Sequence, residues 1–180
     1  MKKIGDMSMG ELAAFVCSHL EQRGIQVVLS GGACVCLYTS NRYQSMDLDF
    51  IDRLHTTRQR LKQVLSEIGF LERKRYFIHP ESEFFLEFPS GPLAVGGEPV
   101  GTVEELSFPT GRLRLLSPTD CVKDRLSAFY HWNDQQCLQQ AVWVARDRSI
   151  DWQEVERWSE QEGERENFAI FRQNFEQAGE

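Results

Sequence analysis

The chain has 180 residues, of which 41% are hydrophobic and 26% charged, and its net charge at pH 7 is −7. This composition is typical of a folded protein with a real core, and it excludes a largely disordered chain. No stretch approaches the roughly 20 apolar residues that span a membrane, and no apolar signal region follows Lys2 and Lys3. We therefore expect a cytoplasmic protein with no membrane partner.

Hydrophobic spacing and capping residues predict the elements of the first part of the chain. Ser8 and Glu11 form a capping-box pattern that starts a helix, and Gly24 is placed to end it. Apolar runs, alternation and turn residues predict the elements that follow. In chain order these are a strand at 25–29, a short helix at 33–38, a strand at 45–51, a helix at 57–68, strands at 70–78 and 83–88, a surface loop at 89–101 and a hairpin of strands at 102–108 and 112–116.

The second part of the chain is predicted to be helical throughout. Ser117 is a cap, Pro118 suits the first helical position and Asp120 is an acid in the first turn. Helices are expected at 119–131, 133–146, 151–161 and 164–177, and Trp132, Trp143, Trp152, Trp158, Phe168 and Phe171 are expected to pack them together. The change from strands to helices predicts a core at 1–116 and a helical C-terminal region at 117–180 packed on it.

Cysteines and charges give two further expectations. The five cysteines form no C-x-x-C pair and lie in apolar helical segments, so we expect buried thiols and no zinc site. Nine acids and three bases lie between residues 150 and 180, which makes the C-terminal helices acidic. A basic cluster could be a nucleic-acid or nucleotide surface, or equally a solvated helix face and edge strand. It consists of Arg53, Arg58, Arg60, Lys62, Arg73, Lys74 and Arg75.

The most informative stretch is residues 27–50. A short apolar strand ends in Ser30, Gly31 and Gly32, and Asp47 and Asp49 follow on the next strand. Carboxylates two residues apart on a strand face the same side about 6.6 Å apart, and at a dielectric near 20 they repel by roughly 2 to 3 kcal/mol. A cation between them would relieve this repulsion. A glycine pair before a helix offers free N–H donors to an anion such as phosphate, so the stretch indicates a site for a metal-bound nucleotide.

The alternation around the two acids predicts which side chains face the core. Met46, Leu48 and Phe50 are expected to point inward while the aspartates point outward. The alternative is that the glycines merely form a tight turn and the acids are solvated. A dinucleotide-binding fold and a P-loop are not supported, because the chain lacks G-x-G-x-x-G after the first strand and lacks G-K-[ST].

This order of an apolar strand, Gly31-Gly32, a short helix and Asp47-x-Asp49 resembles the nucleotidyltransferase superfamily with the polymerase-beta-like fold. The resemblance implies an α+β fold, with a mixed sheet, flanking helices and a helical C-terminal part. It implies that the glycines contact a triphosphate and that the aspartates bind divalent metal, Mg²⁺ or Mn²⁺. A third carboxylate normally comes from a neighbouring strand, and Glu87 between Leu86 and Phe88 is the best candidate. Glu87 would hold the catalytic ion and orient or deprotonate the acceptor hydroxyl.

Further motifs resemble the abortive-infection toxin branch of that superfamily. They are Ala33, Leu37-Tyr38, Arg42, residues 45–50, Ser117-Pro118-Thr119-Asp120, Arg125-Leu126, Ala128 and Asp134. In that branch a lysine is usual where this chain has Arg125, and Lys123 lies two residues earlier, on another face of the helix. This resemblance implies an NTP substrate, an acceptor such as tRNA or a protein, and an antitoxin partner.

Four other residues are candidates for nucleotide binding, each with an alternative. Ser30 could donate to a phosphate or cap the short helix. Arg42 could meet a phosphate or the base, or be a surface cation. Lys123 and Arg125 could reach the triphosphate, or belong to a charged helix face. A catalytic role for His131 is not supported, because no paired nucleophile is visible.

Two functions remain open from the sequence. The first is a metal-dependent nucleotidyltransferase of the EC 2.7.7 type, which moves a nucleoside monophosphate from an NTP to an unknown acceptor, RNA or protein, in a toxin-like role. The second is a non-catalytic binding or partner module built on the same fold, whose acidic C-terminal helices would contact a basic partner.

Overall fold

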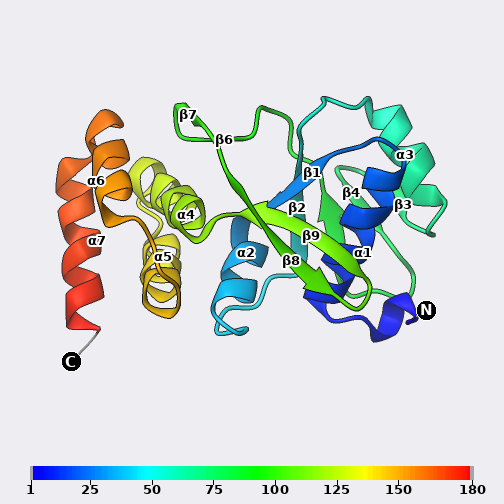
Figure 1. Ribbon diagram of the computed structural model, residues 1–180, viewed down its shortest axis with the longest axis horizontal. Coiled ribbons are helices and arrows are strands. Elements are labelled where there is room, and N and C mark those ends of the chain that lie inside the picture. The colour runs from blue at the N-terminus through cyan, green and yellow to red at the C-terminus, as the bar shows by residue number, and fades with distance from the viewer. Residues whose placement is uncertain (1, 179–180) are drawn as a thin grey trace.

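The computed structural model describes residues 2–178, and its centre is a mixed β-sheet (Figure 1). The strands are β1 (Val27–Ser30), β2 (Asp47–Asp52), β3 (Leu71–Arg73), β4 (Tyr76–Ile78), β5 (Phe85–Glu87), β8 (Val103–Phe108) and β9 (Gly111–Leu116). They form one seven-stranded sheet in the order β3-β4-β5-β2-β1-β9-β8. The pairs β2/β5 and β1/β9 are parallel, and the other neighbouring pairs are antiparallel.

Helices surround this sheet and continue beyond it. They are α1 (Met9–Gln22), α2 (Gly31–Tyr38), α3 (Arg58–Ser66), α4 (Pro118–Trp132), α5 (Gln135–Asp147), α6 (Trp152–Gln161) and α7 (Arg165–Gln177), after a 3-10 turn at Ile4–Asp6. Figure 1 shows α1 and α3 beside the sheet, while α4 to α7 form a separate layer that α2 connects to the sheet. α2 contacts β1 and β2 on one side and α4 and α5 on the other.

The capping signals read from the sequence are confirmed. The Ser8 hydroxyl accepts from the N–H of Glu11 while the Glu11 carboxylate accepts from the N–H of Ser8, which is a complete capping box. The Ser117 hydroxyl accepts from the N–H of Asp120 at the start of α4. Asp134 caps α5 in the same way. Such caps contribute about 1 kcal/mol each by satisfying N–H groups that the helix itself cannot.

The core is built from the apolar positions that the sequence pattern marked. Leu48 and Phe50 of β2 are fully buried, as the alternation predicts. All five cysteines are buried and free of disulfides, as expected. Trp158, Phe168 and Phe171 are buried among the C-terminal helices. No helix within residues 2–178 combines the length and the apolar character needed to cross a bilayer.

Two expectations about packing and one about a strand are wrong. Met46 is 41% exposed, because β2 begins at Asp47, two residues later than expected, and Met46 lies before the strand. Trp132, the last residue of α4, is 82% exposed and is therefore not buried between helices. The single strand expected at 70–78 is a hairpin of β3 and β4, which turns at Lys74 with φ of 56°.

The segment expected to be a surface loop, residues 89–101, contains a short two-stranded ribbon. Its strands are β6 (Ala94–Val95) and β7 (Glu98–Pro99). The carbonyl of Val95 accepts from Trp158 of α6, and Glu98 pairs with Arg157 at 2.7 Å. The ribbon therefore fastens the segment after β5 to the C-terminal helices.

Candidate active site

The turn from β1 into α2 is shaped by Gly31. Its φ is +67°, a conformation that side-chain-bearing residues rarely adopt, and a Cβ there would lie 2.5 Å from Oδ2 of Asp49. A Cβ on Gly32 would lie 2.9 Å from the ring of Tyr43. The glycine pair therefore lets the first turn of α2 approach Asp49 closely, with its free N–H groups at that end of the helix.

Ser30 lies between the glycine turn and the acids. Its hydroxyl donates to the carbonyl oxygen of Asp49 at 3.2 Å, and it makes no capping bond to α2. Ser30 occupies the N-cap position of α2, but its hydroxyl accepts from no N–H of that helix, so the expected side-chain cap is wrong. Phosphate binding by Ser30 stays a prediction.

The parallel pairing of β2 with β5 brings the predicted acids together. Asp49 pairs with Glu87, and Asp47 pairs with Phe85. Residues paired in register face the same side, and neighbouring strands lie about 4.8 Å apart. Asp47, Asp49 and Glu87 therefore extend from one face of the sheet, opposite the face that buries Leu48 and Leu86.

The electrostatics of this cluster suit a cation. Burial raises the pKa of Asp49 from its ordinary value of 3.8 to about 6, and repulsion from Glu87 and Asp47 adds to the effect. Oδ1 of Asp47 is buried and has no hydrogen-bond partner. An unsatisfied buried polar atom costs about 1 to 3 kcal/mol, and more when it is charged. A bound cation would remove both penalties.

The donor set fits Mg²⁺ or Mn²⁺, which prefer carboxylate oxygens. Within residues 2–178, however, no three Asp, Glu, His or Cys side chains already stand in metal-binding positions. One reason is visible at Glu87, whose Oε1 lies 3.2 Å from Nε of Arg75. Loading a metal would therefore need the carboxylates to change rotamer and Glu87 to leave Arg75.

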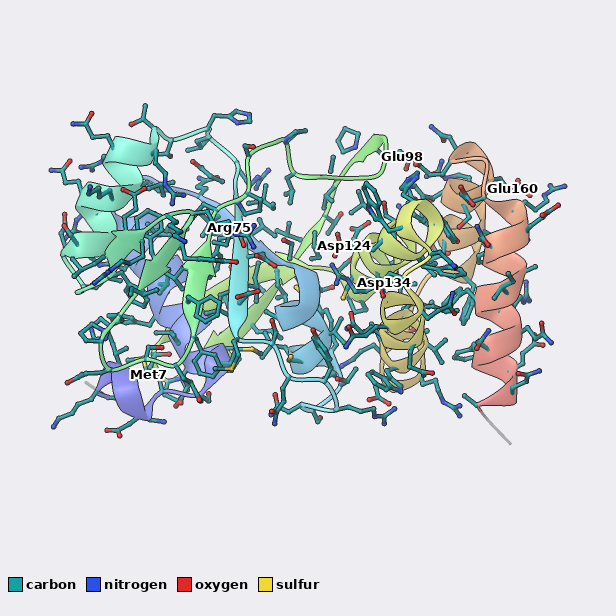
Figure 2. The ribbon with its side chains drawn as sticks, turned by 180° about the vertical axis from the view of Figure 1, so that it is seen from behind. Met7, Arg75, Glu98, Asp124, Asp134 and Glu160 are labelled. Atoms are coloured by element: carbon teal, nitrogen blue, oxygen red, sulfur yellow. The ribbon has the colours of Figure 1, made fainter. Side chains whose placement is uncertain are left out.

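Of the three basic residues predicted individually to bind nucleotide, Arg42, Lys123 and Arg125, only Arg125 lies near the acids. Its charge acts to lower the pKa of Asp49, while its guanidinium bonds to Asp124 and to Gln140 at 3.4 Å. Figure 2 labels Asp124 on α4 and Arg75 beside the sheet. Asp124 was not among the residues predicted from the sequence, although its position beside Arg125 could have indicated it. Arg75 belongs to the basic cluster that the sequence indicated as a nucleotide surface or a solvated edge strand, but no local signal connected it with Glu87.

The structure does not bring Lys123 and Arg42 to the acid cluster. Lys123 is buried and its Nζ lies 2.8 Å from Glu154 and 3.6 Å from Asp120, on the side of α4 toward α6. Arg42 pairs with Asp147 at the end of α5, at 3.3 Å. Nucleotide contacts by these two side chains would require both to give up their present partners.

Comparisons with known proteins bear on the fold. No protein-family model matches the sequence, and no curated protein is similar to it in sequence. An antigenic nucleotidyltransferase-like protein from Paracoccidioides brasiliensis is similar in structure, with a TM-score of 0.55 and 13% identity over 77% of this chain and 75% of that chain. ANT(2")-Ia in complex with adenylyl-2"-tobramycin has a TM-score of 0.50 and 12% identity, over 89% of this chain and 94% of that chain.

These similarities show that the chain has a nucleotidyltransferase-like fold. The expected α+β architecture, a mixed sheet with flanking helices, is confirmed. None of these similarities bears on the abortive-infection toxin branch, so that part of the resemblance stays a prediction.

Proposed function

We propose that this chain is a metal-dependent nucleotidyltransferase, which transfers a nucleoside monophosphate from an NTP to an acceptor. The observation that carries the proposal is the register of β2 and β5, which sets Glu87 beside Asp49 on the face that the Gly31 turn approaches. The fold shared with nucleotidyltransferase-like proteins supports it. The raised pKa of Asp49 and the unpartnered oxygen of Asp47 support it independently of the fold.

The chemistry assigns a role to each residue. The acceptor hydroxyl oxygen attacks the α-phosphorus, a P–O bond forms there, and the bond to the bridging oxygen of pyrophosphate breaks with its electrons leaving on pyrophosphate. Glu87 orients the hydroxyl and takes its proton. The N–H groups of Gly31 and Gly32 donate to phosphate oxygens, with Arg125 nearby as a fixed positive charge. A divalent cation held by Asp47, Asp49 and Glu87 would neutralise charge on the transferred phosphate and the leaving group.

Calorimetric titration of the folded protein with Mg²⁺-ATP, Mg²⁺-GTP, Mg²⁺-CTP and Mg²⁺-UTP tests the proposal. We expect binding of at least one nucleotide, lost in Asp49→Asn and in Asp47→Asn and kept in Glu104→Gln, an exposed acid on β8. Absence of binding with all four nucleotides would instead favour the non-catalytic partner module. Unchanged binding and transfer in both aspartate variants would show that the acids are wrongly assigned.

The resemblance to the toxin branch supports a finer proposal: the acceptor is RNA or protein, and the protein acts as a toxin held in check by an antitoxin. We expect expression of the wild-type chain to arrest growth, and expression of Asp49→Asn at an equal level to leave growth unaffected. Growth arrest by both, or by neither, would refute the toxin role without affecting the transferase assignment.

A further inference from the structure

The acids stand at the end of a longer surface on the sheet. Strand registers place Arg73 opposite Tyr76, Tyr76 opposite Glu87, and Glu87 opposite Asp49, in one row across four strands. Side chains directly opposite each other on a sheet lie on the same face and about 5 Å apart. A polar row thus leads from the edge strand β3 to the catalytic acids.

A second row runs beside the first and is mainly apolar. It consists of Leu71, Ile78 and Phe85, and it ends at Asp47. Leu71 is 57% exposed and Ile78 36% exposed. On the opposite face of the same strands, Phe77 and Leu86 are fully buried. In the part of the chain that the structure describes, this side of β3, β4 and β5 is therefore open where the other is core.

Aromatic rings lie next to Glu87 on this open face. Tyr76 and Phe85 meet edge to face, with ring centroids 5.2 Å apart, and both are half-buried. The guanidinium of Arg75 lies 4.7 Å from the centroid of the Tyr76 ring. Such a pair offers an aromatic face against which a planar ring of a ligand can pack once Arg75 moves away from Tyr76.

Positive charge borders the same surface. The β3–β4 turn carries Arg73, Lys74 and Arg75, and Arg75 is 69% exposed while it pairs with Glu87. Arg58 bonds to the carbonyl oxygen of Arg75 at 2.8 Å, which fixes the backbone of the turn. The arginine side chain can thus move while its backbone stays in place. An exposed ion pair of this kind contributes only about 0 to 1 kcal/mol, so exchanging its partner costs little.

We propose that this face binds the acceptor, and that the acceptor carries a phosphate beside a planar ring. The face, here called the acceptor platform, is defined by Arg73, Arg75, Tyr76, Ile78 and Phe85. The proposal rests on the proposed transferase function. The glycine turn that would receive the NTP lies on the β1 side of the acids, and the platform lies on the β5 side, so the two substrates approach the acids from opposite directions.

The charges of the platform decide the class of acceptor. The ring packs on Tyr76 and Phe85, and the phosphate is held by Arg73 and Arg75, because an arginine fork matches phosphate oxygens in two parallel hydrogen bonds. Arg75 then leaves Glu87, which frees that carboxylate to receive the acceptor hydroxyl. A polycationic acceptor is disfavoured, because the same arginines repel it.

Phenyl phosphate is the probe for this surface, and benzylamine is the matched cationic probe. Each is titrated into the metal-free, nucleotide-free protein in EDTA, and backbone and arginine Nε shifts are followed by NMR. We expect phenyl phosphate to move the resonances of residues 71–78 and 85–87, and benzylamine to leave them in place. Arg73→Gln and Arg75→Gln should each weaken phenyl phosphate binding about tenfold, the loss expected for a hydrogen bond to a charged group.

Arg112→Gln is the control, since Arg112 is also an exposed arginine paired with a glutamate but lies on β9. It should bind phenyl phosphate like the wild type. The inference is overturned if benzylamine binds the platform as tightly as phenyl phosphate does, or if phenyl phosphate moves only the resonances of the β1–α2 turn. It is also overturned if platform shifts depend on protein concentration alone, which would mean that a second copy covers the face. Because no NTP or metal is present, this result is independent of whether the transferase assignment holds.

Discussion

Removing the charge of Asp49 should stabilise the metal-free protein. Its pKa of about 6, against an ordinary 3.8, means that the folded state binds the proton more tightly than the unfolded state does. Stability is therefore lost as the pH rises from about 4 to 6, and the penalty is complete above that range. The folded and unfolded pKa values of Asp49 differ by roughly two pKa units. At 1.36 kcal/mol for each unit, the ionised carboxyl costs about 3 kcal/mol of stability at pH 7. Asp49→Asn removes this cost.

Urea unfolding in EDTA at pH 7 and at pH 4 measures the effect. We expect Asp49→Asn to exceed the wild type by up to about 3 kcal/mol at pH 7 and the difference to vanish near pH 4, where the wild-type carboxyl is protonated. Mg²⁺ at about 1,000 times its Kd should make the wild type the more stable protein, since it adds about 4.1 kcal/mol to the protein that binds it. Equal stabilities at pH 7, or a difference that persists at pH 4, would refute the reasoning. Glu104→Gln, which lacks these neighbours, should show no such pattern.

Two other substitutions test the glycine turn and the buried Lys123 separately. Gly31→Ala forces a side chain into a φ of +67° and against Asp49, so we expect a loss of about 1 to 2 kcal/mol and of NTP binding, while Gly101→Ala, which has open space, should change neither. Lys123→Met removes the cation shared by Glu154 and Asp120, which are both partly exposed, and should cost about 1 to 3 kcal/mol in urea unfolding, against less than 1 for the exposed Lys62→Met. If Lys123→Met abolished NTP binding at full stability, Lys123 would be a nucleotide ligand after all.

The parts of this protein that sequence could predict depend on local chemistry. The capping box at Ser8 and the cap at Ser117 each depend on a pattern of a few neighbouring residues. The helices α1 and α4 begin directly after these two serines. Leu48 and Phe50 alternate with the aspartates, and this alternation alone fixes which side of β2 is buried. Glu87 was a candidate from its apolar flanks, and its place beside Asp49 needed a strand pairing that only the fold supplies.

The features that local patterns could not predict depend on contacts distant in sequence. Ser30 satisfies its hydroxyl on Asp49 of the neighbouring strand, and no local pattern distinguishes this bond from a helix cap. Lys123 and Arg125 are both basic residues of one helix, and only the positions of α6 and the sheet decide that one faces Glu154 and the other Asp49. Arg75 gains its importance solely from the register that sets Tyr76 opposite Glu87.

The ribbon of β6 and β7 has a mechanical consequence. It is joined to Glu87 by residues 88–93 and is anchored to α6 through Trp158 and Arg157, and to the residue after α6 through the bond from the Gly97 N–H to Glu162 at 2.8 Å. A displacement of α6 must either break these anchors or pull on the strand that carries Glu87. The C-terminal helices are thereby connected, through residues 88–99, to Glu87, the one predicted acid that lies outside β2. A movement of these helices can therefore be transmitted to the acid cluster.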